Sequence, residues 1–591
     1  MTAIGFHELV LLLGLFIAID SSEVYPPEVS KTFVENALAR QTFTQELPAD
    51  TVAVFMTANF GVCKSKKGVV IPLSEAVAFA KDVVGKRAQA AAEAKGQEMV
   101  DTAHAIYRSV IRMFHGQLGV ALLNLPEDRR RPDFIVRADI DEMEMTFVGL
   151  LKKIAAALPT PPPGLLPREE EGYLNFADKL YVRIEDKKLY AANSRAVIEK
   201  FLSGAWKGNP LSNSPLYRAA GKRVEFDQEQ FLFVNVERIW QELTARREPV
   251  RGEINMVFGG LLSNVRVIAS SARLSSRGAS KRTAVLFKDL TTGVAKILAR
   301  PNAPSEAATF VPADYSLLLR VNTGSPVGLL RDVMGLHEDV ARELGAGLER
   351  VEQNLGVSIE KDVLPALSGD FALAAKVPPM VGIPESLFIA RIADVDKASA
   401  AVERIVEETG VIGFDEEYRG GKLRVLPLPL VSPAYVFVES HLLVGSSPEI
   451  VKKAIDARLS GKNLAASQGY RAALEGHPSE SVATVYADTQ AIFEGATSIG
   501  GGLAMRKGER KAREIIAPLI ALLRRNAKGL TPVSCSIYRE DNAILLRTNG
   551  PLFAAGPVPF LLPTLFVVRQ VPVEAPPPVE APEILEEITP R

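Results

Sequence analysis

The stretch 435-YVFVESHLLVGSSPEIVKKAID-456 decides the fold, because nearly the same pattern already occurs as 181-YVRIEDKKLYAANSRAVIEKFL-202. Each stretch holds two short runs of β-branched and large apolar residues, followed by apolar residues at helical spacing. The pattern predicts a β-hairpin that leads into a helix packed on a sheet. In the later copy we expect the two strands to be joined across Ser440 and His441.

The start and the end of that helix are also marked in the sequence. Ser447 is suited to the N-cap, Pro448 to the first helical turn and Gly461 to the C-terminal end. Ser446 and Ser447 would also place hydroxyl and N–H groups where an anion could bind. Helix capping explains both serines without a ligand, and we favour it.

The similarity extends far beyond the two stretches. With Leu189 aligned on Leu442, an ungapped alignment places 217-YRAA-220 on 470-YRAA-473. Further matches pair 47-LPAD-50 with 311-VPAD-314, 115-HGQLGVAL-122 with 368-SGDFALAA-375, and 134-FIVRADID-141 with 388-FIARIADVD-396. Their order is the same in both parts of the chain. The sequence therefore predicts an internal duplication of a domain-sized unit.

We expect an α+β fold made of two tandem duplicated domains, each an antiparallel-rich sheet packed with helices against one face. The predicted boundaries are an apolar leader (1–46), a first repeat (47–290), a linker (291–308), a second repeat (309–550) and a Pro-rich apolar stretch with a disordered acidic tail (551–591). The tail composition, rich in Pro and Glu, is typical of disorder.

The apolar run 9-LVLLLGLFIAI-19 has the length of a signal-peptide core and is short for a membrane span. No Lys or Arg precedes it, and Glu8 stands where positive charge is usual. We expect export, with a buried N-terminal helix or a misplaced start as the alternatives.

The amino-acid composition excludes few classes of function. Lys and Arg total 69 and Asp and Glu total 70, so the chain is almost neutral. Its overall charge therefore does not favour binding to a nucleic acid. Two cysteines, Cys63 and Cys535, cannot form a disulfide framework. Either both are buried free thiols, or they link the two repeats.

The succession 311-VPADYSLLLRVN-322, 355-LGVSIEKDVLPALSGDFALAAK-376, 388-FIARIADVDKASAAVERI-405 and 441-HLLVGSSPEIVKKAIDARLSGKNLAASQGYRAAL-474 resembles the bacterial family known as domain of unknown function 3352. The resemblance spans about residues 308–495 and is weaker over 47–245. It implies an exported or envelope-associated protein. It supplies no activity and no catalytic residues.

No motif in the chain indicates a reaction. The six histidines (His7, His104, His115, His337, His441 and His477) lack the spacing of metal ligands, and His337 is expected within a helix. The Gly-rich stretch 498-SIGGGLAMRKGERK-511 lacks the spacing of a phosphate-binding loop, and no nucleophile elbow occurs. We therefore predict no catalytic residue, no cofactor and no metal site.

Three functions remain open. The leading hypothesis is a non-catalytic exported protein that binds an unknown partner or an apolar ligand through the duplicated scaffold. The second is a hydrolase whose site is assembled from distant residues. The third is a peripheral membrane protein that uses a basic amphipathic helix after residue 503, with Ile515, Ile516, Leu519, Leu522 and Leu523 on its apolar side, and the apolar stretch 551–568.

Overall fold

A computed structural model of the chain describes residues 19–20, 43–57, 71–72, 117–124, 132–140, 149, 152, 166–225, 230–245, 260–275, 278–377, 384–428, 431–492, 494–495 and 530–550. Several sequence-based predictions lie outside the described residues. They concern residues 1–18, Cys63, His7, His104, His115, the basic segment after residue 503, and the stretch 551–591.

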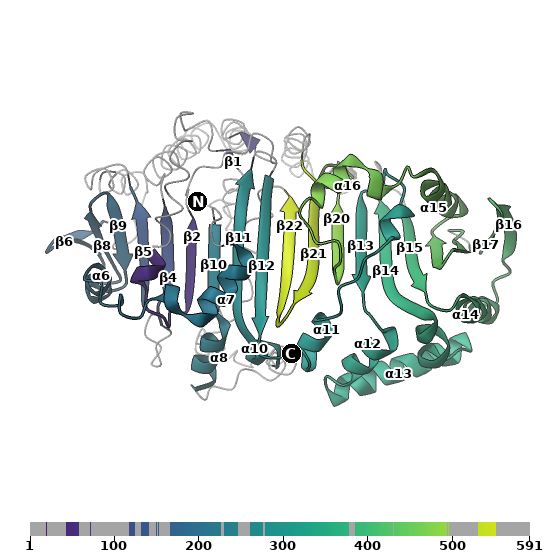
Figure 1. The fold of residues 1–591 in the computed structure, drawn as a ribbon, viewed down its shortest axis with the longest axis horizontal. Helices are drawn as coiled ribbons and strands as arrows, with labels where there is room; N and C mark the ends of the chain where they lie inside the picture. The colour runs from purple at the N-terminus through teal and green to yellow at the C-terminus, as the bar shows by residue number, and fades with distance from the viewer. Residues whose placement is uncertain are drawn as a thin grey trace, which may run out of the picture.

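One antiparallel sheet of twenty strands runs through the described part of the chain. Figure 1 shows it extending along the long axis of the molecule. Its first half comprises β2 (Ala53–Thr57), β4 (Leu118–Leu122), β5 (Phe134–Asp139), β6 (Arg168–Glu170), β7 (Tyr173–Phe176), β8 (Leu180–Glu185), β9 (Lys188–Ala192), β10 (Gln230–Asn235), β11 (Val265–Ser275) and β12 (Gly278–Phe287). A short parallel pair, β1 (Ile19–Asp20) with β3 (Ile71–Pro72), lies apart from it.

The second half of the sheet comprises β13 (Leu317–Asn322), β14 (Leu367–Lys376), β15 (Glu385–Ile392), β16 (Phe414–Tyr418), β17 (Gly421–Val425), β18 (Ala434–Val438), β19 (His441–Gly445), β20 (Ala483–Ala487), β21 (Val533–Glu540) and β22 (Ala543–Gly550). The two halves meet where β12 pairs with β22. The sheet is therefore continuous between the two predicted repeats.

The strand order reads the same outward from that central pair. On one side β12 is followed by β11, β10, β2, β4, β5, β9, β8, β7 and β6. On the other side β22 is followed by β21, β20, β13, β14, β15, β19, β18, β17 and β16. Each strand of the first half thus has an equivalent strand at the same position in the second half, as β10 has in β20.

Strand pairing assigns Phe388 a different counterpart in the first half from the one that the sequence alignment gave. Phe388 on β15 lies opposite Val444 on β19, whereas the residue opposite Ala191 on β9 is Val136 on β5. The structural counterpart of Phe388 is therefore Val136, two residues beyond the Phe134 chosen by sequence. A two-residue shift keeps each side chain on the same face of the sheet, because side chains alternate along a strand.

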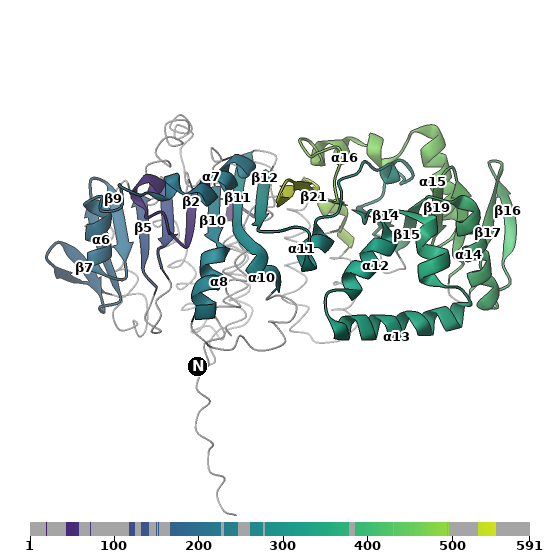
Figure 2. The ribbon, with the colours of Figure 1, turned by 60° about the horizontal axis from the view of Figure 1, so that its bottom comes forward.

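Helices cover both faces of the sheet, and not one face as the sequence suggested (Figure 2). One face, which we call the α15 face, carries α6 (Arg195–Leu202), α7 (Pro215–Val224), α15 (Pro448–Ser460) and α16 (Gln468–Ala473). The opposite face, the α14 face, carries α8 (Val236–Ala245), α10 (Gly260–Asn264), α11 (Gly293–Leu298), α12 (Pro326–Met334), α13 (Glu338–Leu355) and α14 (Val395–Glu408).

Consecutive residues of one strand demonstrate this two-sided packing. On β19, Leu443 packs with Ile450 and Val451 of α15, while its neighbour Leu442 packs with Ala398 of α14. The segment expected to be a simple linker also contributes, because α11 buries Ala295 in an apolar cluster with Phe287. No helix within the described ranges is both long and apolar enough to cross a bilayer.

The predicted hairpin and helix are present at both places, as β8, β9 and α6 and as β18, β19 and α15. β18 and β19 form the hairpin, with Glu439 and Ser440 as the turn; the turn does not include His441, which begins β19. Glu439 adopts a positive φ of 53°, which is unusual for a residue other than Gly and fits a tight hairpin turn. Ser447 occupies the N-cap of α15 and Gly461 ends the helix in the left-handed conformation, as predicted.

Candidate functional site

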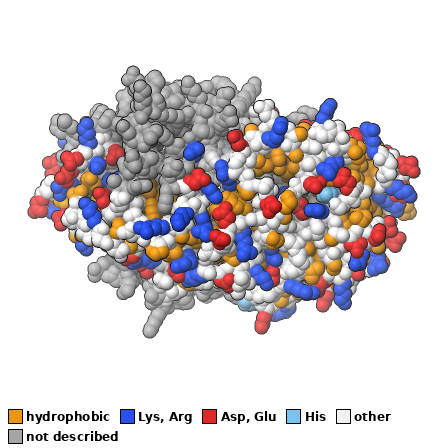
Figure 3. Space-filling view, viewed as in Figure 1, with side chains coloured by type: hydrophobic (Ala, Val, Ile, Leu, Met, Phe, Trp, Pro, Cys, Tyr) orange, Lys and Arg blue, Asp and Glu red, His pale blue; other side chains and the backbone are white. Residues whose placement is uncertain are grey.

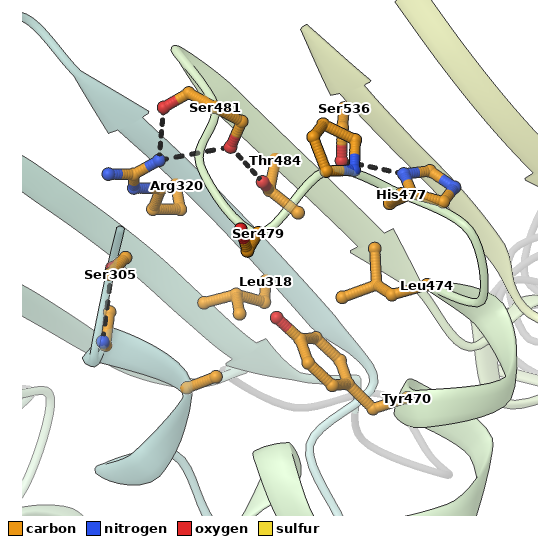
Figure 4. Close-up of a pocket in the computed structure, with 13 residues that line it drawn as sticks. Ser305, Leu318, Arg320, Tyr470, Leu474, His477, Ser479, Ser481, Thr484 and Ser536 are labelled. Atoms are coloured by element: carbon orange, nitrogen blue, oxygen red, sulfur yellow. Dashed lines mark hydrogen bonds between the residues drawn. The ribbon is translucent and has the colours of Figure 1, made fainter. Parts of the chain in front are cut away.

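A cavity of about 270 Å³ lies on the α15 face of the second half, between the sheet and α16 (Figure 4). Its floor is formed by β13, β20 and β21, and its walls by the short 3-10 helix Ala307–Thr309, α16 and the loop that follows α16. The lining residues are Ser305, Ala307, Ala308, Leu318, Arg320, Tyr470, Leu474, His477, Pro478, Ser479, Ser481, Thr484 and Ser536.

Arg320 is the charged residue of the cavity floor. Its side chain is 4% exposed, and its Nε donates to Asp370 Oδ1 over 2.6 Å. Nη1 donates to the carbonyl oxygen of Ser481 over 2.6 Å, and Nη2 donates to that of Pro304 over 3.2 Å. A buried guanidinium needs such compensation, since an unpaired charge in the interior costs several kcal/mol.

A close approach of two loops places the partner of Arg320. Gly369 has φ +90°, and a Cβ built on it would lie 1.9 Å from the carbonyl oxygen of Gly324. The Thr323 N–H donates to the Gly369 carbonyl over 2.8 Å at the irregular start of β14. Only glycine fits here, and its conformation brings Asp370 beneath Arg320. Ser305 Oγ then donates to the other oxygen of Asp370 over 2.8 Å.

His477 bridges two serines of β21. Its Nδ1 lies 2.7 Å from Ser536 Oγ (dashed in Figure 4), and its Nε2 lies 3.1 Å from Ser534 Oγ. Ser534 donates its own hydrogen to the carbonyl oxygen of Ala473 over 2.5 Å, so it accepts from Nε2–H of the histidine. Nδ1 is then an acceptor for the Ser536 hydroxyl. Burial, assisted by the nearby positive charge of Arg547, lowers the pKa of His477 to about 4.

The remaining polar groups of the cavity are hydroxyls. Ser481 Oγ and Thr484 Oγ1 share a hydrogen bond of 2.9 Å. Burial raises the pKa of Tyr470 to about 12, so its phenol stays protonated. Its hydroxyl points into the cavity (Figure 4) and has no hydrogen-bond partner among the described residues. The cavity thus presents donors and acceptors of hydrogen bonds without a carboxylate in its lining.

The chemistry open to this arrangement is limited. Ser536 could transfer its proton to His477, but a base with a pKa of about 4 is weak at neutral pH. Ser536 is also only 1% exposed in the middle of a strand. Within the described ranges, no three His, Cys, Asp or Glu side chains are placed to hold a metal ion. The cavity is suited to binding more than to catalysis.

A second feature lies on the α14 face of the second half. Leu319, Leu373 and Phe388 are direct cross-strand neighbours on β13, β14 and β15, and they are 41%, 44% and 38% exposed. Val485 and Val444 extend the same row on either side. We call these five residues the apolar row. The first-half counterparts of its three exposed members, Phe55, Val120 and Val136, are half-buried, so the exposure belongs to the second half.

The α15 face carries no comparable concentration of one charge. In Figure 3, which views this face, Lys and Arg side chains alternate with Asp and Glu over the coloured area. Ion pairs such as Arg282 with Glu225 at 2.9 Å and Arg458 with Glu439 at 3.0 Å contribute to this mixture. The described part of this face therefore has no extended field that would attract a densely charged ligand.

The residues that the sequence singled out have structural positions. His337 is the N-cap of α13, where its Nδ1 accepts from the Asp339 N–H; it is not inside the helix as predicted. His441 is 4% exposed and packs on the ring of Phe310. Ser447 caps α15 by position without a side-chain hydrogen bond, while Ser446 accepts from the backbone of Ser386.

Cys535 is a free thiol on β21. It is half-buried, and burial raises its pKa. No sequence motif marked the cavity residues, because Arg320, His477 and Ser536 lie in separate elements far apart in the chain. An arginine that follows three leucines in a strand, 317-LLLRVN-322, was the available indication.

The chain was compared with known protein families, curated proteins and solved structures. Residues 376–530 match the model of a family described as "Protein of unknown function (DUF3352)", which agrees with the resemblance inferred from the sequence. Searches among curated proteins and among solved structures found no match.

Proposed function

We propose that this chain is a non-catalytic, exported or envelope-associated protein that binds an apolar ligand across the apolar row. The observation that carries the proposal is the in-register exposure of Leu319, Leu373 and Phe388 on three neighbouring strands of the sheet. Contiguous exposed apolar side chains in a folded protein mark a binding surface more often than chance.

The geometry of the row favours an elongated ligand. From Val485 to Val444 it crosses five neighbouring strands, a span of about 19 Å at the usual strand spacing. Phe371, two residues from Leu373 on β14, stacks on Phe388 with ring centroids 6.3 Å apart and adds apolar area beside the middle of the row. An acyl chain lying perpendicular to the strands would contact each member of the row, and this is the ligand class that we propose.

The proposal predicts that a fluorescent fatty-acid analogue binds the full-length protein and that Leu373→Gln weakens its affinity about tenfold. A tenfold weaker affinity corresponds to roughly 1.4 kcal/mol of binding free energy, which is the order expected for the loss of one apolar contact. Titration of the probe's fluorescence gives both affinities.

Leu459→Gln is the matched control for this test, because Leu459 is a 67% exposed leucine on α15, on the opposite face. It should leave the affinity unchanged. Equal affinities for all three proteins, or no binding at all, would refute the proposal.

Export is supported by the apolar run 9–19 and by what the family resemblance implies. Fractionation of cells that express the full chain, compared with a chain lacking residues 1–20, tests this part. We expect the full chain outside the cytoplasm and the shortened chain inside it. A full chain found entirely in the cytosol would contradict export.

We further propose that the two halves descend from one duplicated domain. The identical strand order on either side of β12 and β22 and the ordered sequence matches support this origin. A hydrolase remains the second candidate, supported by the 2.7 Å contact of Ser536 with His477. Covalent labelling of Ser536 by a fluorophosphonate would favour it over binding alone.

A further inference from the structure

The position of the cavity can be compared with the equivalent position in the first half, because corresponding strands occur there in the same order. Arg320 on β13 lies opposite Thr484 on β20, and in the first half Met56 on β2 lies opposite Phe231 on β10. α7 and α16 occupy matching places, with Tyr217 where α16 has Tyr470. The two positions can therefore be compared residue by residue.

At the first-half position the space is filled with apolar side chains. Met56, Phe231 and Val224 are 3%, 1% and 0% exposed, and Tyr217 packs edge-on against Phe231 with ring centroids 5.7 Å apart. Phe43 packs so tightly over β4 that a Cβ on Gly119 would lie 2.6 Å from its ring. The fold itself therefore does not require a cavity at this place.

The second half replaces this filling by smaller and more polar groups. Thr484 occupies the position equivalent to Phe231, and Arg320 occupies the position equivalent to Met56. A cavity in a core and a buried ion pair both lower stability relative to well-packed apolar residues. Since the same fold can pack the site solidly, the hollow second-half version is best explained by a ligand that occupies it.

The walls indicate the chemistry of that ligand. Hydroxyls of Tyr470, Ser479, Ser481 and Thr484 offer hydrogen bonds, while Leu318, Leu474 and two alanines give the lining apolar surface. The charge of Arg320 is compensated by Asp370, so an ionised ligand would find no free counter-charge in the lining. The cavity volume of about 270 Å³ is that of a site for a small ligand.

We propose that the cavity beneath α16 binds an uncharged, polyhydroxylated molecule of single-ring size, the class of monosaccharides and cyclic polyols. The ring hydroxyls would bond to the serine, threonine and tyrosine hydroxyls, and its C–H faces would contact Leu318 and Leu474. This inference is independent of the apolar row, which lies on the other face of the sheet.

The test is a saturation-transfer NMR screen of the full-length protein with glucose, galactose, N-acetylglucosamine and myo-inositol, with glucuronate as the charged counterpart. We expect transfer to at least one neutral compound and at least a tenfold weaker affinity for glucuronate. Thr484→Phe, which restores the first-half residue, should abolish binding.

Two further variants keep the test decisive if Thr484→Phe does not fold. Thr484→Val removes only the hydroxyl and should weaken binding about tenfold, while Thr548→Val makes the same change on β22 and should have no effect. Thr548 lies two strands away and on the opposite face of the sheet. Absence of transfer to every neutral compound, or equal binding by Thr484→Phe and the unmodified protein, would overturn the proposal.

Discussion

Asp370→Leu is expected to lower the free energy of unfolding by about 3 kcal/mol, because it leaves the guanidinium of Arg320 buried without its counter-charge. The two side chains are 4% and 9% exposed and joined at 2.6 Å, so water cannot readily replace the lost carboxylate. The Ser305 hydroxyl also loses its acceptor. Urea denaturation followed by far-UV circular dichroism measures the change.

The double variant Arg320→Met/Asp370→Leu tests whether the loss of stability comes from the unpaired charge, because it removes both members of the ion pair. It places an apolar side chain where the first half has Met56, which is 3% exposed in a solid core. Removal of both charges should restore the free energy of unfolding to within about 1 kcal/mol of the unmodified protein. A single variant as stable as the unmodified protein would show that this ion pair contributes little.

Stability should also fall as the pH is lowered from about 6.5 to about 4, by as much as roughly 3 kcal/mol, through His477 alone. The pKa of His477 in the folded protein is about 4, below the 6.5 of a free histidine. Between these values the unfolded chain binds a proton that the folded chain does not, so acid favours unfolding. Above pH 6.5 this contribution is complete and constant.

His477→Gln isolates that contribution, because glutamine does not titrate and the carboxylates of the protein remain. Urea titrations at several pH values between 4 and 7 give the free energy of unfolding of both proteins. We expect the difference between them to change with pH only in this window. Parallel pH profiles would mean that His477 is not held neutral by its burial between Ser534, Ser536 and the cavity wall.

The elements that local sequence governs were predictable. Alternating apolar residues, a turn and a helical pattern located β18, β19 and α15, with Ser447 and Gly461 at the helix ends as expected. The turn was wrong by one residue, since His441 pairs with Val438 and begins β19. Its ring is buried against Phe310, a contact between segments far apart in the chain.

The relations between elements were less predictable. Sequence matching aligned Phe388 with Phe134 because a Phe-Ile pair begins both segments, whereas cross-strand pairing aligns Phe388 with Val136. The register of a strand is set by its neighbours in the sheet, and a short sequence match does not record it. Helix amphipathicity indicates that a face is buried but not which side of the sheet buries it, so helices on both faces were not foreseen. The cavity depends on Arg320, His477 and Ser536 meeting in space, and no spacing along the chain records that.

The pairing of β12 with β22 has a consequence for any shorter version of this protein. A chain with one half alone would end its sheet in a bare edge of ten residues at β12, or eight at β22, whose N–H and C=O groups need a partner. By contrast, the outer edges β6 and β16 are short and carry Glu170 and Glu416, which discourages further addition. Two such half-chains would be expected to join edge to edge as a symmetric homodimer, with equivalent edges paired where β12 and β22 pair in the full chain.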